Sequence, residues 1–301
     1  MVALIAYIAD TMTYVGIFGL LTISLNLEAG YTRLMNFGKV AFFAVGAYVS
    51  ALLTVSGAPF LAGLVGGMLV AGLLGLLIAI PTLKLREDYL AITTIAAAEI
   101  IRLILLNENS YGLGPMGIRG IPKPLSGLFG PSGYPLVYMA LVWACLIVWL
   151  LISQRIISSP FGRVLRAIRE DEVATESLGK DVFLFKTKSL VLGSCMAGAA
   201  GSLFAHYTSF VSPDMFMPLL TFSVWTMLIV GGTANNYGAI LGAFLIQMFE
   251  RSTRILKDLV DMPSGAQVNL RWIVIGLLMV IFLMYKPHGV LGERKGKVTP
   301  R

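Results

Sequence analysis

Charged residues are scarce in this chain. Its 301 residues include 23 Lys and Arg and 16 Asp and Glu, so that 13% are charged, whereas about 25% is usual in soluble domains. Hydrophobic residues make up 57% of the chain, and the mean hydropathy is +0.82. A soluble protein needs more charge than this to cover its surface. The composition therefore argues against a water-soluble enzyme and predicts that most of the surface faces lipid.

Cysteine and histidine are also rare, with two of each. Cys145 and Cys195 lie in apolar runs, and His206 and His288 are far apart. These residues are too few for a disulfide framework, a zinc cluster or a haem site. The sequence contains no Ser/His/Asp set and no pair of carboxylates suited to acid–base chemistry. We therefore predict no metal site, no cofactor and no enzymatic activity.

Long apolar runs, in contrast, are plentiful. A bilayer core needs about 20 apolar residues per helix. The seventh and eighth runs are short and are joined by Gly231 to Gly238, which indicates broken or re-entrant helices. No basic segment precedes the first run, so we expect it to be retained rather than cleaved as a signal peptide. The sequence predicts a single all-α transmembrane domain over residues 1–301, a polytopic membrane helix bundle of about 8–10 transmembrane or re-entrant helices. Its nine apolar runs span about 5–27, 37–55, 60–80, 89–106, 135–152, 190–207, 219–230, 239–249 and 272–285.

The net charge of +7 could indicate nucleic acid binding, but the distribution of basic residues favours another interpretation. With nine crossings, 16 of the 23 Lys and Arg fall in one set of alternating loops and six in the other. Basic residues concentrate in cytoplasmic loops. We therefore expect the N-terminus outside, the C-terminus in the cytoplasm, and no nucleic acid partner.

The longest polar stretch, residues 155–188, lies on the predicted cytoplasmic side. Within it, Val164, Leu165 and Ile168 recur at helical spacing, and Gly179 is a plausible helix stop. This pattern predicts one short amphipathic helix, which could lie on the membrane surface. The acidic run 170–172 would be repelled by anionic lipid, so docking into a groove on a partner protein is favoured.

Several motifs in this chain resemble the branched-chain amino acid permeases of ABC importers, the LivM-type family. The similarity covers essentially the whole chain, with the motifs in the right order. Lys39 and the Asn235-Asn236 turn depart from the usual family pattern. The resemblance identifies 155–188 as a cytoplasmic coupling loop that contacts an ATPase. The motifs are Asn36-Phe37-Gly38, Ala47-Tyr48, Leu85–Ile92 with Glu99 to Arg102, Ser159–Arg163, Ala167–Glu172, Leu178-Gly179, Ser212–Phe216 and Pro287–Gly292.

The resemblance implies a permease subunit of a bacterial inner-membrane ABC importer for branched-chain amino acids. It implies a second permease subunit, forming a heterodimer, two ATPase subunits and a solute-binding protein as partners. The chain itself has no phosphate-binding Gly-x-x-x-x-Gly-Lys-Ser/Thr loop. A urea or short-amide permease of the same family and a stand-alone ion-coupled carrier or channel are alternatives. The predicted ATPase-coupling residues are Gly162, Arg163, Arg166, Ala167, Arg169, Glu170, Asp171 and Gly179.

Ionisable residues inside membrane spans are candidates for function because a buried charge is costly. Glu99 and Arg102 are three residues apart, on one helical face, and could form an ion pair that fixes helices or could line the substrate pathway. Asn36 is the third pathway candidate. We expect Lys39 to reach the membrane interface and Glu28 to lie near it.

Small and polar residues predict close contacts between helices. Glycines four residues apart, such as Gly63 and Gly67 or Gly238 and Gly242, let helices approach closely. Asn26 is expected to form a hydrogen bond between helices.

Overall fold

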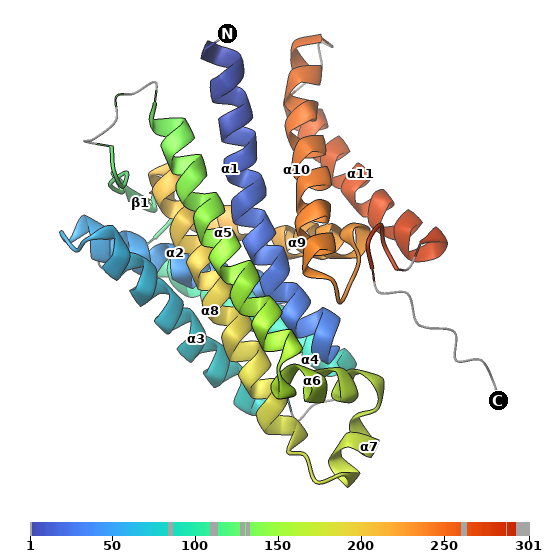
Figure 1. Cartoon of the computed structure of the whole chain (residues 1–301). Helices are drawn as coiled ribbons and strands as arrows, with labels where there is room; N and C mark the ends of the chain where they lie inside the picture. Colours follow the sequence, from blue (N-terminus) through green and yellow to red (C-terminus); the bar gives the residue numbers. More distant parts are fainter. Residues whose placement is uncertain are drawn as a thin grey trace.

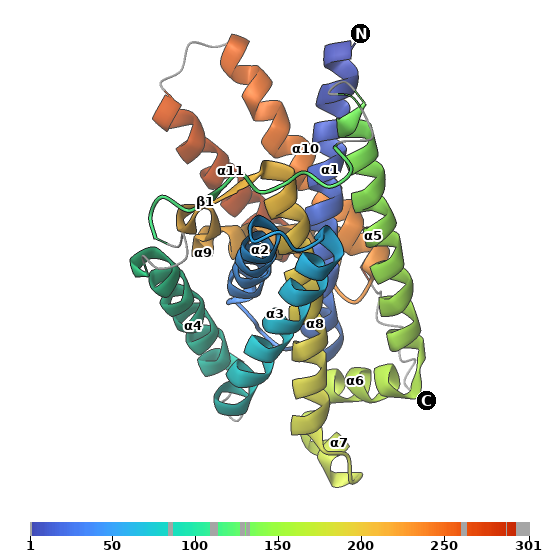
Figure 2. The ribbon, with the colours of Figure 1, turned by 90° about the vertical axis from the view of Figure 1, so that its left-hand side faces the viewer.

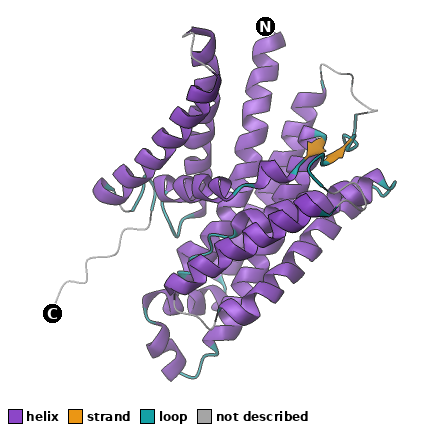
Figure 3. Ribbon diagram, turned by 180° about the vertical axis from the view of Figure 1, so that it is seen from behind, coloured by secondary structure: helices purple, strands orange, loops and turns teal. Residues whose placement is uncertain are grey.

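The computed structural model describes residues 2–83, 87–108, 114–126, 130, 133–259, 264–286 and 288–292. Within these residues the chain is almost entirely helical, with two short strands (Figure 3). The nine predicted apolar runs each correspond to one helix. The helices are α1 (Val2–Leu25), α2 (Lys39–Val55), α3 (Phe60–Thr82), α4 (Glu87–Asn107), α5 (Tyr134–Ser158), α6 (Pro160–Glu170), α7 (Glu172–Ser177), α8 (Val182–Thr208), α9 (Pro218–Gly231), α10 (Asn236–Leu259) and α11 (Ser264–Tyr285).

Five helices in the described residues are long and apolar enough to cross a membrane, or six if the bent pair α9 and α10 is one span. The helices α1 and α8 form the centre of the bundle, because 78% and 83% of their apolar windows are buried. The values for α3, α4 and α5 are 33%, 22% and 22%. The outer helices carry apolar side chains on their exposed faces, as expected where the solvent is lipid. This arrangement is that of a multi-pass membrane protein.

The helices α2, α3 and α8 pack with their backbones in close contact. A Cβ atom at Gly46 would overlap the backbone of Gly198, and one at Gly67 would lie 2.7 Å from the carbonyl oxygen of Gly46. Gly201 faces the backbone of Phe43 in the same way. Small residues thus bring these three helices together by van der Waals contact, which is the main source of helix association in lipid.

The predicted break between the seventh and eighth runs is confirmed. The chain bends by 119° between α9 and α10, and Gly232 at this break has a φ of +113°. A Cβ at Gly232 would overlap the backbone of Gly292, so the turn requires glycine. The segment 288–292 closes this turn, because the Val290 and Leu291 N–H groups donate to the last carbonyls of α9, each at 2.9 Å.

The two ends of the bundle differ. The N-terminus and the strand β1 (Ile118–Arg119) lie at one end, and α6 and α7 lie at the other (Figures 1 and 2). The strand β1 pairs antiparallel with β2 (Phe210–Val211), an element that the all-α prediction did not include. Several helices also extend beyond the predicted apolar runs: α8 begins at Val182 and α10 continues to Leu259. Hydropathy alone does not mark where a helix ends once it leaves the lipid.

Candidate coupling site and the buried charge clusters

The predicted coupling loop begins with the helix α6. The Ser159 hydroxyl accepts a hydrogen bond from the Gly162 N–H at 3.4 Å, and Pro160 follows the cap, a typical helix start. Leu165 and Ile168 are buried, three residues apart and on one face, and Gly162 is buried too. A Cβ at Gly162 would overlap the Ile157 backbone. This glycine is therefore needed for the fold itself.

The single helix predicted for this loop is wrong, because it is divided at Asp171. Asp171 has extended backbone angles, and its carboxylate accepts from the Ala174 N–H at 2.9 Å, which caps α7. Its neighbours in the acidic run form ion pairs: Glu170 with Arg169 at 3.1 Å, and Glu172 with Lys186 of α8 at 2.5 Å. Asp171 caps α7 instead of continuing α6, although the helical pattern of the sequence continues past it.

The outward faces of α6 and α7 are the part of this loop that a partner could reach. Arg163 and Ala167 of α6 are exposed, and Val173 and Leu178 are 72% and 81% exposed. Gly179 ends the segment with a φ of +77°. Exposed apolar side chains beside arginines are typical of a protein docking surface.

One arginine of α6 connects this surface to the centre of the bundle. The Arg169 guanidinium donates to the carbonyl oxygen of Gly30 at 3.0 Å. Gly30 ends a π-helical turn, Asn26–Gly30, that continues α1. Such turns expose backbone groups that a regular helix would satisfy, and they are common at functional sites. A displacement of α6 would therefore act on α1 directly.

The same turn of α1 carries a buried ion pair, which we call the Glu28 cluster (Glu28, Asn36 and Lys39). The Lys39 Nζ lies 2.6 Å from the Glu28 carboxylate, and both side chains are 0% exposed. The Asn36 amide donates to the second carboxylate oxygen at 2.9 Å. The expectation that the Lys39 ammonium group reaches out to the membrane interface is wrong, because it is buried against Glu28. Pairing over a short loop between α1 and α2 lets both charges be buried together.

A second polar contact ties the π-helical turn to other helices. The Asn26 amide donates to the Asn236 side-chain oxygen at 2.8 Å, and Asn236 in turn donates to the Ser153 hydroxyl at 2.9 Å. The Ala234 N–H donates to the Asn26 side-chain oxygen at 2.9 Å. The predicted helix-to-helix bond of Asn26 is thus confirmed. The contact joins α1 to α10 and α5.

The remaining pathway candidates lie on α4. Glu99 and Arg102 form an ion pair at 2.5 Å, and Arg102 lies 3.8 Å from Asp214. The side chains of Glu99 and Arg102 are 36% and 17% exposed. Among the described residues, no hydrogen bond or ion pair joins this pair to Asn36, although the Phe37 N–H donates to Thr94 of α4 at 3.1 Å.

A third group of charges, which we call the Asp10 cluster (Asp10, Tyr14, Tyr207 and Arg251), lies toward the other end of α1. The Asp10 carboxylate pairs with Arg251 of α10 and accepts from the Tyr207 hydroxyl of α8. The Arg251 guanidinium lies 3.8 Å from the Tyr14 ring centre. Sequence reasoning missed this cluster, because its members are 241 residues apart at the extremes. The only indication in the sequence was that a carboxylate and an arginine, Asp10 and Arg251, each lie near the end of an apolar run.

The fold defines a multi-pass membrane helix bundle with a short amphipathic helix connected to its central helix. Sequence comparison specifies the family: the "Branched-chain amino acid transport system / permease component" family matches residues 7–283, and the chain belongs to it.

Named relatives agree with this assignment. LivM of Salmonella typhimurium, a high-affinity branched-chain amino acid transport system permease protein, is 32% identical over 94% of this chain and 69% of its own length. A probable LivM of Methanocaldococcus jannaschii is 30% identical over 97% and 95%. LivH of Escherichia coli is 23% identical over 92% and 91%. No solved structure matches the chain significantly.

Proposed function

We propose that this chain is a permease subunit of an inner-membrane ABC importer that carries branched-chain amino acids. The names of its LivM relatives support the substrate class. The similarity to both LivM and LivH proteins supports pairing with a second, related permease subunit. Two separate ATPase subunits and a solute-binding protein complete the importer.

The observation that carries the proposed mechanism is the hydrogen bond from Arg169 to Gly30. In this mechanism α6 and α7 dock on an ATPase, with Arg163, Arg166 and Ala167 in or beside the contact. Closure of the ATPases moves α6, and Arg169 passes that movement to α1. The bond from Asn26 to Asn236 carries it to α10. Alternating access results from rocking of these helices. Asn36, Glu99 and Arg102 are the proposed pathway residues.

The proposed orientation places α6 and α7 in the cytoplasm, where ATP is available. The N-terminus and β1, at the opposite end of the bundle, then lie outside. The concentration of basic residues in residues 155–188 supports this assignment.

Replacement of Ala167 by Trp tests the ATPase contact. Ala167 is exposed on α6, so the fold tolerates the change, whereas overfilling a packed interface costs about 1–3 kcal/mol. We expect copurification of the ATPases and leucine uptake by the reconstituted importer each to fall at least about fivefold. Ala140→Trp on the exposed face of α5 is the matched control. Normal assembly and uptake in the Ala167 variant would refute the proposed contact.

The transported solute is tested separately with the unaltered importer. We expect leucine, isoleucine and valine to compete for uptake and uptake to require ATP. Uptake of urea in preference to leucine would identify the short-amide branch. Uptake driven by an ion gradient in the absence of ATPases would identify a carrier.

A further inference from the structure

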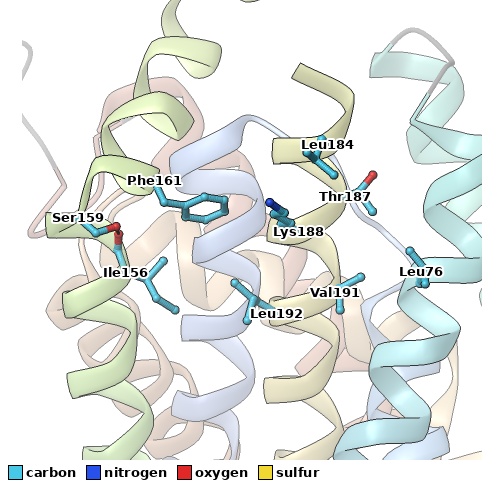
Figure 4. A pocket seen from close by; sticks show the side chains of 9 residues that line it. All are labelled: Leu76, Ile156, Ser159, Phe161, Leu184, Thr187, Lys188, Val191 and Leu192. Atoms are coloured by element: carbon cyan, nitrogen blue, oxygen red, sulfur yellow. Dashed lines mark hydrogen bonds between the residues drawn. The ribbon is translucent and has the colours of Figure 1, made fainter. Parts of the chain in front are cut away.

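An apolar groove lies beside the start of the coupling helix. It has a volume of about 610 Å³, and its floor is α8, with α3 on one side and the junction of α5 and α6 on the other (Figure 4). This volume is in the range of small-molecule sites. The lining side chains are Leu76, Ile156, Ser159, Phe161, Leu184, Thr187, Lys188, Val191 and Leu192.

The walls of the groove are built from helices of the membrane domain. Each of α3, α5 and α8 is long and apolar enough to span a bilayer. Leu76 on one wall is 41% exposed, and Leu184 on the floor is 43% exposed, so the groove is open along its side. The groove runs from the polar start of α8 to its apolar part, as a site for a lipid at the membrane surface requires, and an acyl chain matches its apolar lining.

One cation, Lys188, lines the groove, and its charge favours lipids with anionic headgroups. The neighbouring Lys186 is paired with Glu172, whereas Lys188 is exposed and has no carboxylate partner among the described residues. Its Nζ lies 6.0 Å from the centre of the Phe185 ring. A lysine in this position lays its methylene groups along apolar surface and holds its ammonium group at the headgroups. An apolar protein helix would bury this charge without a partner, which is costly, whereas an anionic headgroup supplies the counter-charge.

We propose that the groove binds one phospholipid with an anionic headgroup, with an acyl chain against Val191 and Leu192 and the headgroup on the Lys188 ammonium group. Because Ser159 and Phe161 also line the groove, this lipid contacts the first turn of α6. The ring of Phe161 stacks on Phe185 at 5.4 Å, so the lipid adjoins a contact that fixes α6 against α8.

Photoactivatable lipids test this site in the intact importer, reconstituted in nanodiscs. Phosphatidylglycerol and phosphatidylcholine that carry the same reactive acyl chain are compared by mapping labelled peptides. We expect phosphatidylglycerol to label residues 184–192 about fivefold more than phosphatidylcholine, the factor that corresponds to one basic residue near the membrane surface. Lys188→Ala should abolish this preference. Lys180→Ala removes an exposed cation from the same loop outside the groove and should retain it.

A second variant fills the groove. Val191→Trp should reduce labelling by both lipids while leaving Lys188 in place. Equal labelling by the two lipids, or an unchanged preference in Lys188→Ala, would overturn the proposal. Disulfide crosslinking of Leu184→Cys to a cysteine in the second permease subunit would also overturn it, because the groove would then be an interface between permeases. These measurements require no transport, so their outcome is independent of the proposed substrate and ATPase contact.

Discussion

Two charge clusters lie near opposite ends of α1 and bind it to neighbouring helices. They differ in how exposed their charged side chains are. Glu28 and Asp10 are 18 residues apart, roughly 27 Å along the helix. In the Glu28 cluster both charged side chains are 0% exposed. In the Asp10 cluster Arg251 is 5% exposed and Asp10 is 35% exposed. One cluster is sealed, and the other keeps a carboxylate in contact with the surroundings.

This difference determines what happens when each pair is broken. A fully buried ion that loses its partner has no solvent to replace it, whereas a partly exposed carboxylate can be hydrated. The Glu28 cluster also bridges a short chain segment between α1 and α2, while the Asp10 cluster joins α1 to α8 and α10, which are distant in sequence. We therefore expect the Glu28 end of α1 to be held more firmly than the Asp10 end.

Lys39→Met should produce the largest effect. The substitution keeps the volume but leaves the Glu28 carboxylate buried with only Asn36 as a donor. Breaking a buried pair in this way costs about 3–5 kcal/mol. We expect a corresponding loss in the free energy of unfolding, measured for the purified subunit in detergent.

Two further variants test the cause of that loss. Adding Glu28→Gln to Lys39→Met should restore at least half of the lost stability, because no buried charge remains. Lys180→Met, at an exposed lysine outside both the buried pair and the groove, should leave the free energy of unfolding unchanged. If the double variant were no more stable than Lys39→Met, the buried charge would not be the cause.

The sequence predicted the helices better than the charges. Within the described residues, hydropathy located a helix at each of the nine predicted runs and the break at Gly232, because burial in lipid requires apolar runs of defined length. The prediction for Lys39 was wrong. Lysines near the end of a span usually extend to the membrane interface, but the Lys39 ammonium group is bound by Glu28, 11 residues away. Hydropathy also gave no prediction for the pairing of Arg251 with Asp10 on the first helix. Pairing of this kind is set by helix packing, which one sequence does not reveal.

The loop between α5 and α8 was predicted in part. Its place and amphipathic character followed from the spacing of Leu165 and Ile168, which are buried as that spacing requires. The break at Asp171 did not follow, because the same side chain suits a helix surface and a helix cap. The contact from Arg169 to Gly30 depends on the π-helical turn, and residue spacing along α6 gave no signal for it.

Arg251→Met should have an intermediate effect. It removes a charged hydrogen bond to Asp10 and the contact with the Tyr14 ring, while Tyr207 still donates to the carboxylate. Hydrogen bonds to charged groups contribute about 1.5–3 kcal/mol. We expect a loss in the free energy of unfolding in this range, smaller than that of Lys39→Met. A loss equal to or larger than that of Lys39→Met would remove the proposed difference between the two ends of α1.

Tyr207→Phe should produce the smallest effect and refines the comparison within the Asp10 cluster. The change deletes one hydroxyl donor and keeps the ring, which lies 5.3 Å from Tyr14 and 5.4 Å from Tyr138. Asp10 retains Arg251 and its exposure to the surroundings, so the free energy of unfolding should fall by only about 1 kcal/mol. Combined with Arg251→Met, the loss should exceed the sum of the two single losses, because the carboxylate then has no donor from either helix. Strict additivity in this double-mutant cycle would mean that the two donors act on Asp10 independently and that hydration compensates for both.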